Sequence, residues 1–138
     1  MARAIRLEFE GAVYHVMSRG NERKDIFVSP ADSTRFLEVV EEMCDRFSMD
    51  VYAYVLMGNH YHLLVETARP NLSRAMHYLN SVYSQYFNRR HERVGHFFQG
   101  RYSALLIDKD SYLLELTRYI HLNPVRAGMA RRPEQYAW

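Results

Sequence analysis

Two histidines separated by a single residue, His60 and His62, are the side chains whose types and spacing most directly suggest chemistry in this sequence. In a β-strand, residues two apart point to the same face. A strand is expected here because two runs rich in β-forming residues flank the turn dipeptide Gly58-Asn59. Two adjacent imidazoles can hold one divalent metal ion. The pair alone is a weak signal, because most such pairs in arbitrary sequences are structural.

A second set of candidate residues lies at helical spacing toward the C-terminal end. Glu115, Tyr119 and Asn123 are four residues apart, so they share one face of a helix expected from about Ser111 to Asn123. Asn123 or Glu115 could add an oxygen ligand to a metal ion held by the histidines, a mixed set that suits magnesium or manganese. Tyr119 would then be a nucleophile, although its hydroxyl, with a pKa of about 10, needs a neighbour that withdraws the proton.

Other tyrosines and histidines compete for these roles. Tyr112 lies seven residues before the candidate nucleophile on nearly the same helix face, and Tyr102 is the next alternative among the 11 tyrosines. His15, His77 and His96 are expected to be surface or packing residues rather than metal ligands.

The net charge of +2 says little about a polyanionic partner, but the kind of positive charge is more informative. Of the 18 lysine and arginine residues only Lys24 and Lys109 are lysine, and arginine has the planar donor geometry that grips phosphates. Arginines between residues 89 and 101 lie among tyrosine and phenylalanine residues, a mixture suited to single-stranded nucleic acid. The same segment also fits an amphipathic helix with a solvated basic end, and a GC-rich genome would equally explain the arginine bias.

The expected elements alternate in type along the chain. A strand at 11–19 is followed by a helix that begins at Ser29-Pro30 and carries an apolar stripe to Phe47. A hairpin at 50–67 and a helix from Pro70 to about Arg90 come next. The chain then forms a strand at 101–107 and a third helix at 111–123. This order predicts an α+β fold of the ferredoxin-like type, with a four-stranded antiparallel sheet, helices packed on one face and a C-terminal catalytic helix.

The length and the 48% hydrophobic content predict one domain spanning residues 1–138. Without a signal peptide or a membrane-spanning apolar run, the protein is expected to be cytoplasmic.

Three ordered motifs carry a resemblance to a known family. They are Gly58-Asn59-His60-Tyr61-His62-Leu63-Leu64, Gly95-His96-Phe97-Phe98-Gln99-Gly100-Arg101-Tyr102 and Arg118-Tyr119-Ile120-His121-Leu122-Asn123-Pro124-Val125-Arg126-Ala127-Gly128. In this order and at these separations, they make the sequence resemble the REP-associated tyrosine transposases, which are single-tyrosine HUH transposases. The resemblance covers nearly the whole chain, from the strand around Tyr14 to Trp138.

The resemblance implies a nuclease and strand transferase that cleaves single-stranded DNA at palindromic hairpins, forms a 5′-phosphotyrosine link and leaves a free 3′-hydroxyl. By position, His60 and His62 match the HUH pair, and Tyr119 matches the catalytic tyrosine. Asn123 stands where relatives place a third polar ligand, and the implied cofactor is Mg²⁺ or Mn²⁺. Residues that bind DNA do not transfer by position, so they are chosen from charge and placement: Arg19, Arg89, Arg90 and Arg101.

Two other functions stay open at this point. One is a domesticated regulator that binds hairpin DNA without cleaving it, against which the intact histidine pair and tyrosine argue. The other is a metal-dependent hydrolase that activates water, for which Tyr119 would be dispensable. The expected partners are single-stranded DNA hairpins like REP palindromes, with no membrane. The apolar stripe of residues 112–122 suits both a monomer and a homodimer that exchanges the tyrosine helix.

Overall fold

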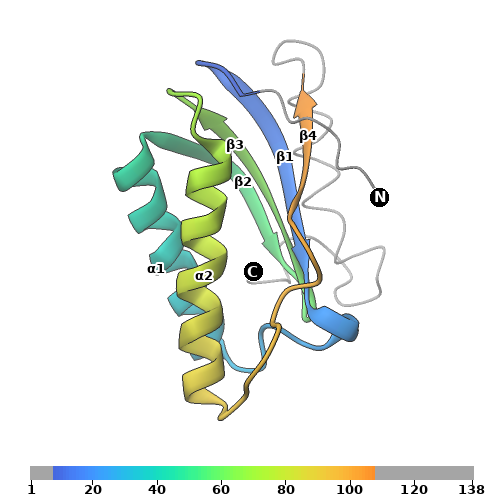
Figure 1. Ribbon diagram of the computed structural model, residues 1–138. Helices are drawn as coiled ribbons and strands as arrows, with labels where there is room; N and C mark the ends of the chain where they lie inside the picture. The colour runs from blue at the N-terminus through green and yellow to red at the C-terminus, as the bar shows by residue number, and fades with distance from the viewer. Residues whose placement is uncertain (1–7, 108–138) are drawn as a thin grey trace, which may run out of the picture.

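The computed structural model describes residues 8–107, which form four strands and two long helices (Figure 1). The elements are β1 (Ala12–Arg19), a short 3-10 helix (Asn21–Arg23), α1 (Pro30–Phe47), β2 (Met49–Leu56), β3 (His60–Thr67), α2 (Leu72–Arg90) and β4 (Ser103–Ile107). The strands pair antiparallel in the order β2-β3-β1-β4. This is the ferredoxin-like α+β arrangement predicted from the sequence. The helix predicted at 111–123 lies outside the described residues.

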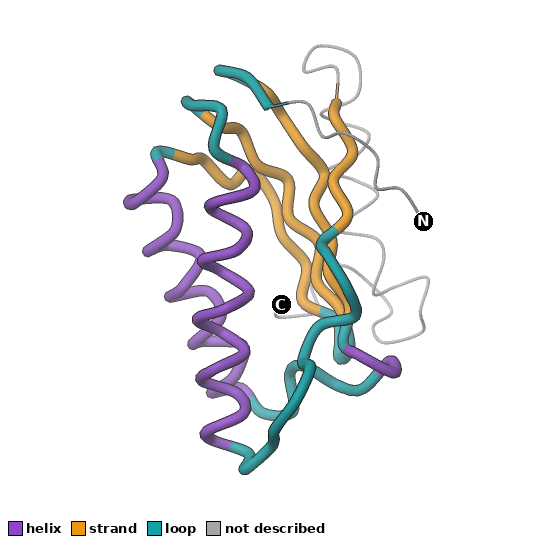
Figure 2. The backbone as a smooth tube through the Cα atoms, viewed as in Figure 1, coloured by secondary structure: helices purple, strands orange, loops and turns teal. Residues whose placement is uncertain are grey.

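Helices α1 and α2 lie side by side on one face of the sheet, and the main core fills the space between the two layers (Figure 2). Alternate residues of each strand reach this core, because successive side chains of a strand point to opposite faces. On β3 they are Tyr61, Leu63 and Val65, all fully buried. Phe36 of α1 meets Tyr61 with ring centroids 4.7 Å apart. Removal of these side chains from water is the main contribution that holds the helices on the sheet.

The ends of α1 follow signals that are visible in the sequence. The Ser29 hydroxyl accepts a hydrogen bond from the backbone N–H of Asp32 at 3.4 Å, and Pro30 occupies the first helical position. Ser48 ends the helix in the left-handed region, with φ of 56°. The predicted beginning at Ser29-Pro30 and end near Phe47 are therefore confirmed.

The turn between β2 and β3 is the predicted Gly58-Asn59 dipeptide, and it is held by the loop that follows β1. The backbone N–H of Gly20 donates to the Asn59 carbonyl at 2.8 Å. A Cβ atom on Gly20 would lie 2.1 Å from the Lys24 carbonyl oxygen, so no larger residue fits without moving the backbone. This packing fixes the turn immediately before His60.

The strand β4 is shorter than predicted, beginning at Ser103 rather than at residue 101. Gly100 turns the chain with φ of 63°, and the Tyr102 ring is then buried in the core. The Tyr102 hydroxyl lies 3.1 Å from Ser73 Oγ at the first turn of α2. Glu8 accepts hydrogen bonds there from the Ser73 backbone N–H at 2.7 Å and from its hydroxyl. The carboxylate thus caps the amino end of α2.

The opposite face of the sheet carries a smaller buried apolar cluster, made of Val13, Ala53, Val55, Met57 and Leu64. Val13 and Leu64 are each two residues from a histidine, so the strand period places those histidines on this same face. Within residues 8–107, neither helix is long and apolar enough to cross a membrane.

Candidate metal centre

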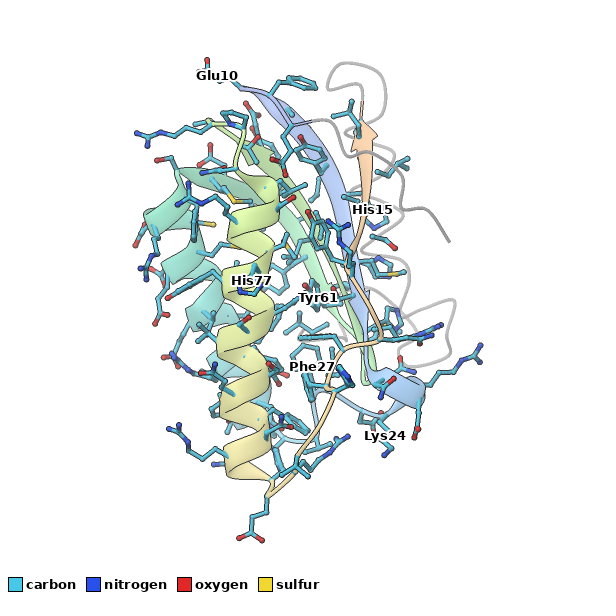
Figure 3. The ribbon with its side chains drawn as sticks, in the orientation of Figure 1. Glu10, His15, Lys24, Phe27, Tyr61 and His77 are labelled. Atoms are coloured by element: carbon cyan, nitrogen blue, oxygen red, sulfur yellow. The ribbon has the colours of Figure 1, made fainter. Side chains whose placement is uncertain are left out.

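The sheet brings three histidines together on the face away from α1 and α2. His60 and His62 have ring centroids 5.0 Å apart on β3. His15, on the adjacent strand β1, stacks on His62 with centroids 5.1 Å apart and ring planes 25° apart. Tyr61, between the β3 histidines, points the other way into the main core (Figure 3). The strand therefore places the two candidate ligands on one face and the buried Tyr61 that anchors them on the other.

The hydrogen bonds of Asn59 determine which nitrogen of His60 carries its proton. Asn59 Nδ2 donates to the Arg23 carbonyl at 3.4 Å, so Asn59 Oδ1 is the atom that faces His60. His60 Nδ1 lies 2.8 Å from this oxygen and must donate to it. Nε2 of the neutral ring then carries a lone pair, the state in which imidazole binds a metal.

His62 has a ring partner of a different kind. Its Nδ1 lies 2.9 Å from Nε2 of His15, and either nitrogen can be the donor. If His62 binds a metal through Nε2, its Nδ1 must hold the proton and donate it to His15. The expectation that His15 is a surface or packing residue missed this contact. His77 and His96 are exposed, as expected.

The protonation of all three rings is shifted toward the neutral form. Burial lowers the pKa of His15, and burial together with the nearby positive charge of Arg19 lowers the pKa of His60. Burial, followed by the two neighbouring histidines, lowers the pKa of His62 to about 3. Protons therefore compete little with a metal for these nitrogens at neutral pH.

The donor set fits a partly open metal site. Among residues 8–107, no group of three or more His, Cys, Asp or Glu side chains is placed to hold a metal ion. Two neutral imidazoles leave coordination positions for oxygen ligands, including water or a phosphate. The predicted oxygen ligand Asn123, its alternative Glu115 and the predicted nucleophile Tyr119 lie outside the described residues.

A buried polar network beneath the histidines holds β3 in register with its neighbours. The Tyr61 hydroxyl donates to Asn80 Oδ1 of α2 at 2.7 Å and lies 3.3 Å from Ser18 Oγ of β1. Asn80 Nδ2 donates to the same Ser18 oxygen at 3.2 Å. One helix and two strands are thus tied together at the residue between the candidate ligands.

The four arginines chosen as DNA contacts do not form one patch. Arg19 lies opposite His60 in the β1–β3 register, and its guanidinium donates to Gln99 Oε1 at 2.9 Å. Arg89 and Arg90 are at the carboxyl end of α2, where Arg90 lies 3.7 Å from the buried Asp32 carboxylate. Arg101 lines a separate cavity of about 330 Å³. Of the four, Arg19 is the one that pairs in register with a histidine.

The aromatic residues near these arginines belong mostly to the core. Tyr83, Phe87, Phe97 and Tyr102 are each 7% exposed or less. These four buried rings cannot serve as a platform on which bases stack, and the part of the segment up to Arg90 is an amphipathic helix with a basic end. On α2, Tyr83 and Phe87 face the core, whereas Arg89 and Arg90 are exposed.

The sequence matches the family described as IS200-like transposases over residues 8–123. A comparison with curated proteins finds no match. This family match agrees with the transposase resemblance found in the sequence motifs.

Two solved structures share the fold. A REP-associated tyrosine transposase bound to a REP hairpin superposes with a TM-score of 0.83 at 14% identity, covering 100% of this chain and 81% of that one. A candidate transposase from Deinococcus radiodurans R1 superposes with a TM-score of 0.58, also at 14% identity, covering 86% of this chain and 95% of that one. At these identities the likeness shows the fold, and it confirms the predicted α+β class.

Proposed function

The chain belongs to the IS200-like transposase family, and we propose that it acts as a metal-dependent nuclease and strand transferase on single-stranded DNA. The proposal treats residues 1–138 as one HUH tyrosine transposase domain. It rests above all on the adjacent His60 and His62, whose Nδ1 atoms each have a hydrogen-bond partner. Such partners orient metal-binding imidazoles and fix their protonation.

In this proposal His60 and His62 hold Mg²⁺ or Mn²⁺ together with Asn123. When bound, the ion supplies Lewis-acid polarisation of a non-bridging oxygen of the scissile phosphate. The Tyr119 hydroxyl oxygen forms the new bond to phosphorus, and the bond from phosphorus to the 3′-oxygen breaks. The proton lost by the tyrosine hydroxyl is balanced by the proton that the leaving 3′-oxygen gains from solvent. The products are a 5′-phosphotyrosine and a free 3′-hydroxyl.

The proposed substrate is DNA that folds into a palindromic hairpin. The similar structure of the REP-associated tyrosine transposase was solved with a REP hairpin, and this chain shares its fold. Arg19 lies opposite His60 and is the arginine best placed to contact a phosphate beside the metal. Arg89 and Arg101 are exposed, at the carboxyl end of α2 and at the cavity of about 330 Å³, and we assign them weaker contacts with the DNA backbone. Arg90 is the poorest of the four, because Asp32 already engages it.

The test is cleavage of a DNA hairpin with single-stranded flanks, labelled at both ends and incubated with Mn²⁺. A denaturing gel should show the 3′-labelled fragment linked to the protein through its 5′ phosphate, and the 5′-labelled fragment released with a free 3′-hydroxyl. Tyr119→Phe should give neither product, while the matched control Tyr112→Phe retains both. The double variant His60→Ala, His62→Ala should also lose cleavage. Cleavage without a covalent product would instead indicate water as the nucleophile, and binding without cleavage would indicate a hairpin-binding regulator.

A further inference from the structure

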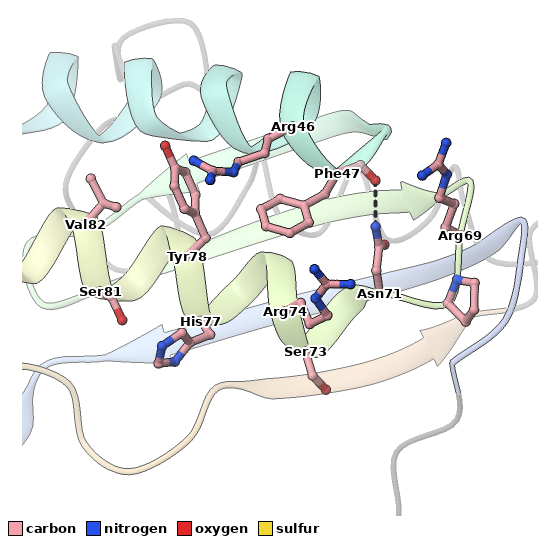
Figure 4. Close-up of a pocket in the computed structure, with 11 residues that line it drawn as sticks. Arg46, Phe47, Arg69, Asn71, Ser73, Arg74, His77, Tyr78, Ser81 and Val82 are labelled. Carbon is pink, nitrogen blue, oxygen red and sulfur yellow. Dashed lines mark hydrogen bonds between the residues drawn. The ribbon is translucent and has the colours of Figure 1, made fainter.

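A groove of about 860 Å³ opens on the helix side of the molecule. Its walls come from the last turn of α1, the β3–α2 connection and the first half of α2 (Figure 4). The histidines lie on the other face of the sheet, because Tyr61, their neighbour in β3, points toward the helices. The groove is therefore separate from the candidate metal centre.

Positive charge dominates this groove. Its lining includes Arg46, Arg69, Arg74 and His77, all exposed, and no aspartate or glutamate. Among residues 8–107, none of the three arginines forms an ion pair. Arg35 on the same helix α1 differs, because its guanidinium lies 3.3 Å from the Glu42 carboxylate. The groove thus gathers cations whose protein counter-ions are missing from the described part of the chain.

Arg46 is held in position at the wall of the groove. Its guanidinium carbon lies 5.0 Å from the centre of the Tyr78 ring. The Tyr78 hydroxyl donates to Glu42 Oε2 at 3.1 Å, and its ring packs against Phe47 with centroids 5.7 Å apart. A guanidinium stacked on a fixed ring keeps its N–H edges free to bind two phosphate oxygens.

Asn71 adds a second, independent feature to the groove. Its side chain is 9% exposed, and Nδ2 donates to the Phe47 carbonyl at 2.8 Å. Its Oδ1 is buried without a hydrogen-bond partner. A buried acceptor without a partner is unfavourable, and a donor group on a bound ligand would satisfy it. Nucleotides offer both kinds of group: phosphate oxygens, which arginines bind, and base amino groups, which can donate a hydrogen bond to an amide oxygen.

We propose that this groove binds a strand of DNA, with Arg46, Arg69 and Arg74 contacting phosphates and a base amino group facing Asn71. The inference builds on the proposed function, because the ligand is the same hairpin that the metal centre cleaves. Since the groove and the histidines lie on opposite faces of the sheet, the groove holds a part of the DNA other than the scissile phosphate. It strengthens binding of the DNA and takes no part in the bond exchange.

The test measures the affinity for a fluorescein-labelled DNA hairpin with single-stranded flanks at several salt concentrations between 50 and 200 mM. Each lost phosphate contact should reduce the slope of log K against log salt by about 0.9. The variant with Arg46, Arg69 and Arg74 all changed to glutamine should therefore bind about 10-fold or more weakly, with a clearly shallower slope. The matched control is Arg35→Gln, which removes an arginine of α1 outside the groove and should bind as the wild type does.

The outcomes separate this inference from the proposed function. Equal affinity and equal salt slope for the triple variant and the wild type would overturn the groove assignment, even if cleavage proceeds normally. A weakened triple variant, in a protein that forms no covalent product with the same hairpin, would retain the groove and overturn the strand-transfer mechanism. Thermal melting of the triple variant, whose changed side chains are exposed, checks that it is folded.

Discussion

Replacing His15 with alanine tests whether the stacked histidine supports metal binding by His62. In the native protein His15 Nε2 lies 2.9 Å from His62 Nδ1. When His62 binds a cation, its Nδ1–H becomes a more polarised donor, so the acceptor on His15 gains importance. His15→Ala removes that acceptor, while His15→Gln keeps an oxygen at a similar reach from the backbone. We expect weaker Mn²⁺ binding for the first variant and near-normal binding for the second.

The size of the effect follows from the single hydrogen bond that is lost. A hydrogen bond with a charged partner contributes about 1.5–3 kcal/mol. This range corresponds to a loss of about 10- to 160-fold in metal affinity, close to the usual cost, about 10- to 100-fold, of removing a partner of a metal-binding histidine. Calorimetric titration with Mn²⁺ in the absence of DNA measures it directly.

His77→Ala is the control for this titration, because His77 is exposed on α2 and lies away from the histidine cluster. Its metal affinity should match that of the wild type. Equal Mn²⁺ affinity for His15→Ala and the wild type would refute the supporting role of His15. So would a glutamine variant as weak as the alanine variant, because the acceptor would then be irrelevant.

Three further predictions concern stability. Asp32→Ala should lower the free energy of unfolding by about 2–4 kcal/mol in urea titrations, because Asp32 is fully buried and its carboxylate accepts from the Val28 N–H and the Tyr86 hydroxyl. Tyr61→Phe should cost about 1–3 kcal/mol, because Asn80 Oδ1 loses its 2.7 Å partner; an unchanged melting temperature would contradict this. The third prediction is pH dependence: the pKa of His62 is lowered from 6.5 to about 3, so the unfolded chain binds more protons between these values and stability falls as the pH drops. Between pH 6.5 and pH 5 the loss from His62 is about 1.6 kcal/mol, and His62→Gln should show a correspondingly flatter dependence.

The fold could be predicted from local signals because these signals are strong in this sequence. Ser29-Pro30 begins α1 and Gly58-Asn59 forms the hairpin turn, as their side-chain and backbone chemistry requires. The spacing of His60 and His62 on one strand was equally local. The order of these elements then left few arrangements that bury every apolar face.

Features that depend on contacts between distant segments could not be predicted. His15 meets His62 only because β1 pairs with β3 in one register, and the two residues are 47 positions apart. The groove arginines come from α1, from the β3–α2 connection and from α2, so no single stretch of sequence shows their clustering. The aromatic residues beside the arginines of residues 89–101 fitted both a core and a nucleic-acid surface, because hydrophobic and nucleic-acid-binding aromatics look alike until burial is known.

The most direct test of the central proposal identifies the residue that becomes joined to DNA. After incubation of the wild type with the hairpin and Mn²⁺, the covalent product is digested with nuclease and trypsin and analysed by tandem mass spectrometry. Trypsin cuts after Arg118, which separates Tyr119 and its competitor Tyr112 into different peptides. The proposal predicts a nucleotide 5′-phosphate on the peptide 119–126. Attachment to the peptide that contains Tyr112, or cleaved DNA without any modified peptide, would contradict it.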